Sequence, residues 1–286
     1  PPPMVDLLGG LMDDEPAASA PAPAAAAGVG GAMGGLEDLF GGPTAAAPAP
    51  AAAALPKVAL PADRGEGMQV RSAIVNQGGR LFQQITIENN SMAPLSGFAV
   101  QYNKNSFGLV PETPNALGQV LPPSIAPGQS ASGLVPLKHD GQPSDSKGAV
   151  QMAIKNNVKV FYFQDVCDVC AFLAADGRLE KNAFLEQWRA LPGECSVQAQ
   201  GLAPAQENVD AVCTRLEAAS IFFIARRKMP DGADMVYFSV KTLNGLTLLA
   251  EIGFRPGSGA ASIAVKSSSA PYVPLLAESL QKLLKM

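Results

Sequence analysis

The stretch "SIFFIARRKMPDGADMVYFSVKTLNGLTLLAEIGF", residues 220–254, determines the expected fold of the C-terminal half of the chain. It contains three runs rich in β-branched and aromatic residues: 220–227, 234–241 and 246–254. Asp231-Gly232 and Asn244-Gly245 lie in the gaps, and such pairs favour tight hairpin turns because they accept positive φ. The stretch therefore predicts three consecutive antiparallel strands.

Helical patterns flank these strands. Apolar residues recur at helical spacing in three segments: 180–191, 207–219 and 270–286. We expect the last helix to begin after Pro274, with Leu276 and Leu280 facing inward. A further strand is predicted at 261–267. Residues 169–286 are thus predicted to form an α+β domain, an antiparallel sheet with helices on one face.

The preceding segment has the pattern of a β-sandwich. Short alternating or apolar runs are separated by clusters of Gly, Pro, Asn and Asp: 68–75, 81–89, 97–103, 130–137, 149–156 and 158–164. Short strands at this spacing are typical of an antiparallel sandwich of about 110 residues. We therefore expect an immunoglobulin-like β-sandwich over residues 57–168.

Residues 1–56, called the tether below, differ in composition from the rest. Ala, Pro and Gly make up 36 of these 56 residues, and the six charged residues are all acidic. Burial of so few large apolar groups cannot offset the entropy that is lost when the backbone is ordered. We therefore expect a disordered, flexible segment. The chain begins with Pro rather than Met, and we expect it to be a piece of a longer protein.

The sequence offers little material for catalysis. His139 is the only histidine and lies in a predicted turn, so a Ser-His or Cys-His pair would have to use it. Cys167 and Cys170 have the spacing of a metal or redox pair, but no second pair accompanies them. We expect no enzyme activity, no metal and no cofactor. The competing interpretation is a hydrolase or lyase built on a β-sandwich.

Charge and hydropathy exclude further classes of function. The chain has 21 basic and 25 acidic residues, which does not provide the dense cationic face that nucleic acid requires. No apolar run reaches the roughly 18 residues needed to span a bilayer. Four cysteines do not make a disulfide framework in a chain of this size. We therefore expect a cytoplasmic protein that meets membranes only through its partners.

Several strings closely resemble the C-terminal appendage, or ear, of the β-adaptins, the large β subunits of clathrin adaptor complexes. They are "VQYNKNSFGLVP" (100–111), "IKNNVKVFYF" (154–163), "DGRLEKNAFLEQWRALP" (176–192) and "LNGLTLLAEIGFRPG" (243–257). The resemblance begins near Lys57 and extends to the end of the chain. It implies a sandwich subdomain followed by a subdomain called the platform, with the tether corresponding to the hinge of the family.

The resemblance also implies partners. The ear of this family binds accessory proteins through short Phe-rich acidic motifs, the hinge binds clathrin, and a trunk absent from this sequence binds the other adaptor subunits. Such a protein would be peripheral on clathrin-coated vesicles and pits and on trans-Golgi membranes. The alternative within this class is the appendage of a non-clathrin vesicle coat.

Residues of the family's peptide sites match positions of this chain. The platform positions are Lys181, Trp188, Arg227, Tyr237 and Glu251, and the sandwich-side site is centred on Tyr162. Ser196 occupies a position where the family often has a second glutamate, so ligand preference can differ. From the residues alone, each position also has an ordinary structural interpretation: a half-buried strand tyrosine for Tyr237, a cross-strand ion pair for Arg227 and Glu251, and a plain surface tyrosine for Tyr162.

Trp188 is the position where the two interpretations compete most directly. At about 100° per residue, Trp188 lies about 40° from Phe184 on a helical wheel, which favours core packing. Lys181 lies within about 20° of Trp188, and a lysine is seldom fully buried. We therefore expect Phe184 and Leu191 to face inward and Trp188, beside Lys181, to be exposed to a ligand.

Two short islands in the tether are candidate clathrin-binding motifs. They set Leu or Phe beside acidic residues: Asp6, Leu7, Leu8 and Leu11 in the first, and Asp38, Leu39 and Phe40 in the second. The first departs from the usual clathrin box of the family, because Gly10 falls where an apolar side chain is expected. Two weak sites on one flexible chain give useful avidity on a multivalent lattice. The alternative is incidental composition in a linker.

Overall fold

The computed structural model of the chain describes residues 56–139, 143–191, 194–255 and 257–286. The predicted disordered hinge therefore lies outside the described residues, except for Pro56. None of the described helices is long and apolar enough to cross a lipid bilayer.

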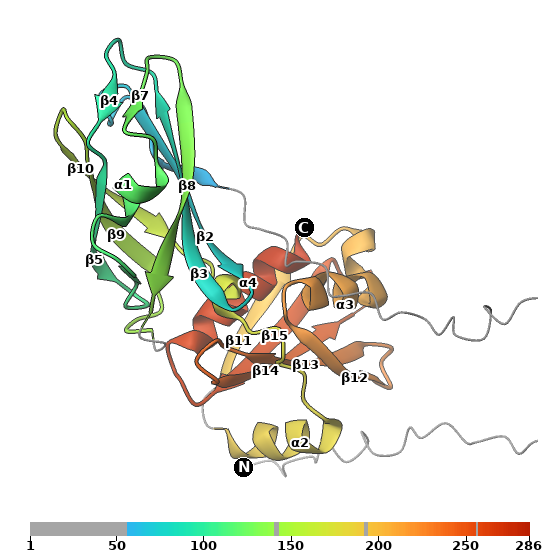
Figure 1. Ribbon diagram of the computed structural model, residues 1–286. Helices are drawn as coiled ribbons and strands as arrows, with labels where there is room; N and C mark the ends of the chain where they lie inside the picture. The colour runs from blue at the N-terminus through green and yellow to red at the C-terminus, as the bar shows by residue number, and fades with distance from the viewer. Residues whose placement is uncertain (1–55, 140–142, 192–193, 256) are drawn as a thin grey trace, which may run out of the picture. The chain divides into compact units, whose positions relative to one another are not determined.

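The first half of the described chain consists of antiparallel sheets (Figure 1). One sheet has the order β1 (Lys57–Leu60), β2 (Met68–Gln77), β3 (Arg80–Asn89), β8 (Ser130–Lys138) and β6 (Val110–Pro111). The second has the order β10 (Val160–Val166), β9 (Ala149–Lys155) and β5 (Ala99–Asn105). A short helix, α1 (Ala116–Val120), and a small pair, β4 (Leu95–Ser96) with β7 (Ser124–Ile125), complete this half.

The two larger sheets enclose an apolar interior. Alternate residues of β3 are buried, as the period of a strand with one inward face requires. Gln83 of β3 points into this interior and joins the sheets, because its Nε2 donates to Ser72 Oγ at 2.8 Å and lies 2.9 Å from Met152 Sδ of β9. The prediction of antiparallel strands throughout this segment is confirmed.

The second half is built on one five-stranded antiparallel sheet. Its order is β11 (Glu194–Gln200), β15 (Ala260–Ser267), β14 (Thr247–Phe254), β13 (Asp234–Lys241) and β12 (Phe222–Lys228). The predicted three-strand arrangement over 220–254 is confirmed, with Gly232 and Gly245 both at positive φ in the turns. Strand β11 was not predicted, because its sequence "ECSVQAQ" is mostly polar and its apolar side chains are too small to give a clear strand pattern.

Helices lie on both faces of this sheet rather than on the one face that we expected (Figure 1). The three helices are α2 (Lys181–Ala190), α3 (Val209–Ala218) and α4 (Tyr272–Leu284). Helices α3 and α4 cover the face of Val236 and Phe238, which are completely buried. Helix α2 contacts the opposite face, through Phe184 and Tyr237. Helix α4 begins before Pro274, because a proline is tolerated in the first turn.

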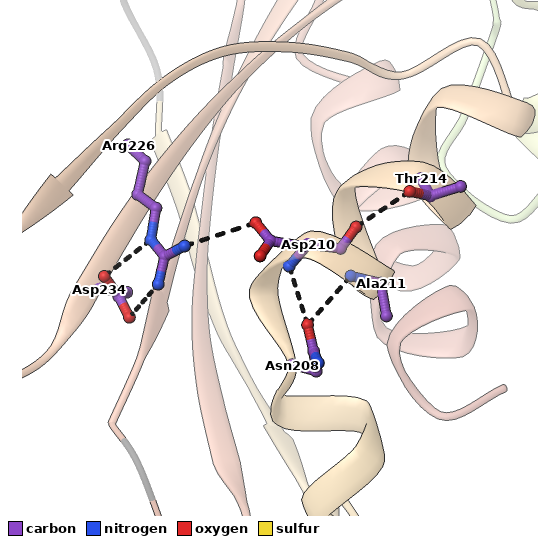
Figure 2. Close-up of polar contacts among 6 residues, drawn as sticks. All are labelled: Asn208, Asp210, Ala211, Thr214, Arg226 and Asp234. Atoms are coloured by element: carbon purple, nitrogen blue, oxygen red, sulfur yellow. Dashed lines mark hydrogen bonds and ion pairs between the residues drawn. The ribbon is translucent and has the colours of Figure 1, made fainter.

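Polar contacts fix the start of α3 beside the hairpin of β12 and β13 (Figure 2). Asn208 caps the helix, since its Oδ1 accepts from the amides of Asp210 and Ala211. Arg226 of β12 donates to both carboxylate oxygens of Asp234 at 2.9 and 2.8 Å and also contacts Asp210. The guanidinium therefore links the hairpin to the first turn of α3.

The two halves share packing around a short 3-10 helix, η2 (Val169–Phe172). Phe172 stacks on Phe107 with 4.2 Å between ring centroids, and Asn76 Nδ2 donates to Leu173 O at 2.9 Å. The described residues, from Pro56 onward, belong to one compact unit. The division into 57–168 and 169–286 stays a proposal.

Cys167, Cys170 and His139 lie near this junction. Burial raises the pKa of both thiols well above the ordinary value, and nearby aspartates add to the effect. His139 packs edge-on against Phe172. These surroundings favour protonated thiols and structural packing.

Candidate functional site

Helix α2 carries the residues of the expected platform site. Phe184 and Leu185 are buried, and the remaining positions of the helix are exposed or half-buried. Phe184 holds the helix on the sheet, because its ring contacts Tyr237 of β13 as well as Trp188 of the same helix. Leu191, expected to face inward, is the C-terminal cap residue and is half-buried.

Trp188 is half-buried, which lies between the core residue of one interpretation and the exposed residue that we expected. One side of its indole stacks on Phe184, with 5.6 Å between centroids and 18° between planes. Lys266 of β15 places its Nζ 4.8 Å from the ring centroid and 3.3 Å from Trp188 O. Trp188 therefore presents a rigid, partly covered aromatic surface beside a cation.

Tyr237 is buried, with only 2% of its surface exposed. Its ring meets Phe184 edge-on, at 5.7 Å between centroids. Burial raises the pKa of Tyr237 well above its ordinary value, and the charge of Glu251 and a hydrogen bond to that carboxylate add to the effect. In the structure the ring packs against Phe184 of α2 and the hydroxyl donates to Glu251, so little of Tyr237 is open to solvent; ligand contact at Tyr237 stays a prediction.

Arg227 and Glu251 lie on the same face of the sheet and are half-buried. Glu251 stands directly opposite Tyr237, and Arg227 stands opposite Met235. Strand β13 lies between the strands of these two residues, so Arg227 and Glu251 are not directly opposed in register. Both charges adjoin Tyr237, whose pKa responds to each of them.

Small side chains make this face shallow between α2 and Arg227. Ser262 and Ala264 of β15 are half-buried, and Gly253 of β14 has no side chain at all. A Cβ at Gly253 would lie 2.9 Å from Met235 Sδ and 2.5 Å from Ser262 Oγ, so glycine lets the methionine lie across the strand. We call the set Trp188, Lys266, Ala264, Glu251, Met235 and Arg227 the platform face.

Sequence reasoning missed Lys266 and, although it placed Met235 on the same strand face as Tyr237, did not name Met235 as a site residue. The alternation of "ASIAVKS", with Ser262, Ala264 and Lys266 on one side, marks the first of these as a residue of the open face. Its position beside Trp188 depends on where α2 lies on the sheet, which no local pattern specifies.

Lys181 and Ser196 lie at the edges of this region. Lys181 is exposed at the first position of α2, two turns before Trp188. Ser196 of β11 is exposed and stands opposite Ala264, which in turn stands opposite Glu251. The replacement of the family's second glutamate by serine therefore falls on the same side of the sheet as Glu251.

Tyr162, the expected centre of a sandwich-side site, is the most exposed tyrosine of the described chain at 68%. Phe161 and Phe163 are buried, so the predicted alternation along β10 is confirmed. Val160 and Val166 flank Tyr162 on the same side and are also exposed. This gathering of apolar groups is more than an isolated surface tyrosine would show.

The expected clathrin-binding residues of the tether lie outside the described residues. They are Asp6, Leu7, Leu8, Leu11, Asp38, Leu39 and Phe40.

Comparison with known proteins identifies the family. Residues 174–284 match the family described as the β2-adaptin appendage, C-terminal sub-domain. The AP-1 complex subunit beta-1 of Homo sapiens is 33% identical over 269 residues, which is 89% of this chain and 28% of the relative. The corresponding subunit of Rattus norvegicus is 32% identical over 92% of this chain, and the AP-1 complex subunit beta of Dictyostelium discoideum is 28% identical over 79%.

These relatives are much longer than the chain, which spans less than a third of their length. The similarity nevertheless extends over 89% of this chain for the human relative. The chain belongs to the β-adaptin family and contains its appendage, with the C-terminal subdomain at residues 174–284.

Proposed function

We propose that the platform face binds short peptide motifs of accessory proteins in clathrin-mediated vesicle transport. The observation that supports this most strongly is the half-buried Trp188, stacked on Phe184 and placed beside Lys266. A tryptophan fixed in this way loses little side-chain entropy when an apolar residue packs on it, which is typical of interface anchors.

The chemistry of the face favours a peptide with aromatic and acidic residues. Met235 and Trp188 are both half-buried, and their exposed parts would provide apolar contact for phenylalanine side chains of a peptide. Lys266 lies beside Trp188, and Lys181 and Arg227 add positive charge elsewhere on this side of the sheet, so that three cations against Glu251 favour a ligand with carboxylates. Phe-rich acidic motifs are therefore the ligands that we propose for it.

We propose a second peptide site on the sandwich, centred on Tyr162. Its exposure and the neighbouring Val160 and Val166 support this role. We also propose that residues 57–168 form an immunoglobulin-like subdomain and that residues 169–286 form the platform subdomain. Two sites on one appendage would let it hold two partners, or two motifs of one partner.

The tether is proposed to bind clathrin through its two acidic islands. Residues 6–8 and 38–40 each place a leucine or phenylalanine beside aspartate in an Ala/Pro/Gly-rich segment. Weak binding at each would sum to useful avidity where many clathrin copies are presented together. Peptide capture by the appendage would then be coupled to assembly of the coat.

The remaining proposals follow from the relatives, which are named as subunits of AP-1 complexes. We propose a peripheral protein of coated vesicles that joins the other adaptor subunits through a part not included in this chain. We propose no catalytic role and no cofactor, and membrane contact only through partners.

Two variants test the two activities separately. In the first arm, a synthetic Phe-rich acidic peptide is titrated into the chain and into Trp188→Ala, with folding checked by circular dichroism. We expect at least a tenfold loss of affinity, in line with a hot-spot residue. Unchanged affinity in the folded variant would remove Trp188 from the site.

In the second arm, residues 5–15 and 36–40 are deleted and capture of purified clathrin is measured. We expect capture to disappear while peptide affinity stays unchanged. Persistent capture would move clathrin binding into the appendage, and no capture by the unmodified chain would favour the appendage of a non-clathrin coat.

A further inference from the structure

A bulge in β5 shapes the outer face of the three-stranded sheet. Tyr102 stands opposite Met152 and Asn105 opposite Val150, so Asn103 and Lys104 both face the single residue between these partners, Gln151. A bulge of this kind redirects side chains and bends the strand. Here it brings an exposed lysine next to the middle of β9.

A pocket with a volume of about 280 Å³ lies at this bulge. Its lining is polar and comes from β5, β9, β10 and the segment before β9: Lys104, Ser106, Asp145, Lys147, Gln151 and Gln164 among others. The pocket is large enough for one carboxylate-bearing side chain and provides amide and ammonium donors around it.

The charges of the described lining favour an anion. Asp145 Oδ1 already accepts from Ser106 Oγ at 2.6 Å and from the Lys147 amide at 2.9 Å. These hydrogen bonds, with the charges of Lys147 and Lys104, lower the pKa of Asp145, so it is ionised at neutral pH. The described lining thus contains two ammonium groups and one carboxylate, and that carboxylate already accepts hydrogen bonds from Ser106 and Lys147.

The pocket adjoins Tyr162 in a defined register. Gln151 stands opposite Gln164, and the next outward pair along the same strands is Ala153 with Tyr162. Strands rise about 3.3 Å per residue, so the nearer side of the pocket is about 7 Å from Tyr162 along β10. Ala149 also lines the pocket and stands opposite Val166. The pocket therefore continues along the strands for about a further 7 Å away from Tyr162.

We propose that this pocket is the acid-binding part of the sandwich-side site: it accepts the carboxylate of a Glu or Asp in an extended peptide whose aromatic side chain packs on Tyr162. The inference rests on the proposed role of Tyr162 and specifies its ligand. From the register, the aromatic and acidic residues of the peptide are two to four positions apart.

The test uses synthetic peptides with one Phe and one Glu at every separation from one to six, in both orders, in a Gly/Ser background. A matched set has Gln in place of Glu. Binding to the full 286-residue chain is followed by the backbone amide NMR shifts of β9 and β10, so that occupancy of the platform face does not enter the readout. We expect the tightest binding at separations of two to four, and weaker binding of every Gln peptide.

Two charge variants locate the acid. Lys104→Gln combined with Lys147→Gln should lower the affinity for the Glu peptides about fivefold and leave the affinity for the Gln peptides unchanged. Lys155→Gln is the matched control, because Lys155 is exposed on β9 on the other side of the Ala153–Tyr162 pair. Loss of Glu-peptide binding in Lys155→Gln, with no loss in the double variant, would overturn the inference.

Tyr162→Ala separates this inference from the function on which it rests. Weaker binding of both peptide sets to Tyr162→Ala confirms the sandwich-side site whatever the lysines do. If Tyr162→Ala changes neither set, the sandwich-side site itself is wrong. If Tyr162→Ala weakens both sets and the double lysine variant weakens neither, only the pocket is wrong.

Discussion

Lys266 is the residue whose contribution to the platform face can be isolated most cleanly, because its Nζ lies over Trp188 while its neighbours on β15 are small. We expect Lys266→Gln to lower the affinity for an acidic Phe-containing peptide about fivefold and to reduce the salt dependence of binding. Titrations at two ionic strengths measure both effects. Lys285→Gln, at the exposed end of α4, is the matched control and should change neither quantity.

A different result would redefine the residue. If Lys266→Gln weakens a neutral peptide as strongly as an acidic one, the lysine acts by positioning the indole and not by its charge. In that case Lys266→Met, which keeps an apolar stem beside the ring, should restore most of the affinity.

At single positions, the sequence predicts which side of an element a residue occupies better than how far it is exposed. The alternation that turns Tyr162 outward and Phe161 inward is a local property of the strand. The burial of Tyr237 depends on Phe184 of α2, which is far away in sequence. The half-burial of Trp188 likewise requires Lys266 from another strand.

The contact between α3 and the β12–β13 hairpin depends on Arg226 and Asp234 (Figure 2). Hydrogen bonds from Arg226 lower the pKa of Asp234 in the folded state. The stabilisation is therefore complete above the unfolded value of about 4 and is lost as the pH falls through the lower folded value. We expect Asp234→Asn to reduce the free energy of unfolding by about 2 kcal/mol at pH 7.

Urea unfolding at several pH values checks this expectation. The difference between Asp234→Asn and the unmodified chain should shrink as the pH falls below about 4. Asp210→Asn is the control, since Asp210 is 91% exposed and lies 3.5 Å from Arg226. A loss as large in Asp210→Asn, or a difference that does not depend on pH, would contradict this account.

At the scale of elements, strongly patterned segments were predictable and weakly patterned ones were not. The hairpins at Gly232 and Gly245 follow from turn chemistry and alternating strands. Strand β11 pairs with β15 along its whole length, yet its sequence is mostly polar because one side of this edge strand faces solvent. Helix α2 is clear from periodicity, whereas the face of the sheet that it covers is a tertiary property.

At the scale of the whole molecule, the sheets of the first half and the sheet of the second half contact each other at η2. Phe172 is buried and stacks on Phe107 of the sandwich. We expect Phe172→Ala to cost about 3–5 kcal/mol and to lower one common unfolding transition of both halves. Calorimetry with probes in each half measures this. Met92→Ala, at an exposed position, should leave the transition unchanged.

Two separate transitions, of which only one responds to Phe172→Ala, would show that the halves fold independently. The change from antiparallel strands alone to strands accompanied by helices was predictable from the sequence pattern. The packing shared by the two halves was not, because it depends on aromatic residues at positions 107 and 172 whose contact crosses the predicted boundary.

The fluorescence of Trp188 tests the central claim most directly, because it is the only tryptophan of the chain. A Phe-rich acidic peptide is titrated while Trp188 emission and its quenching by acrylamide are recorded, with calorimetry in parallel. The account predicts a saturable change in emission and a loss of quenching, both at the dissociation constant that calorimetry gives. Calorimetric binding that leaves the emission and the quenching of Trp188 unchanged would contradict it.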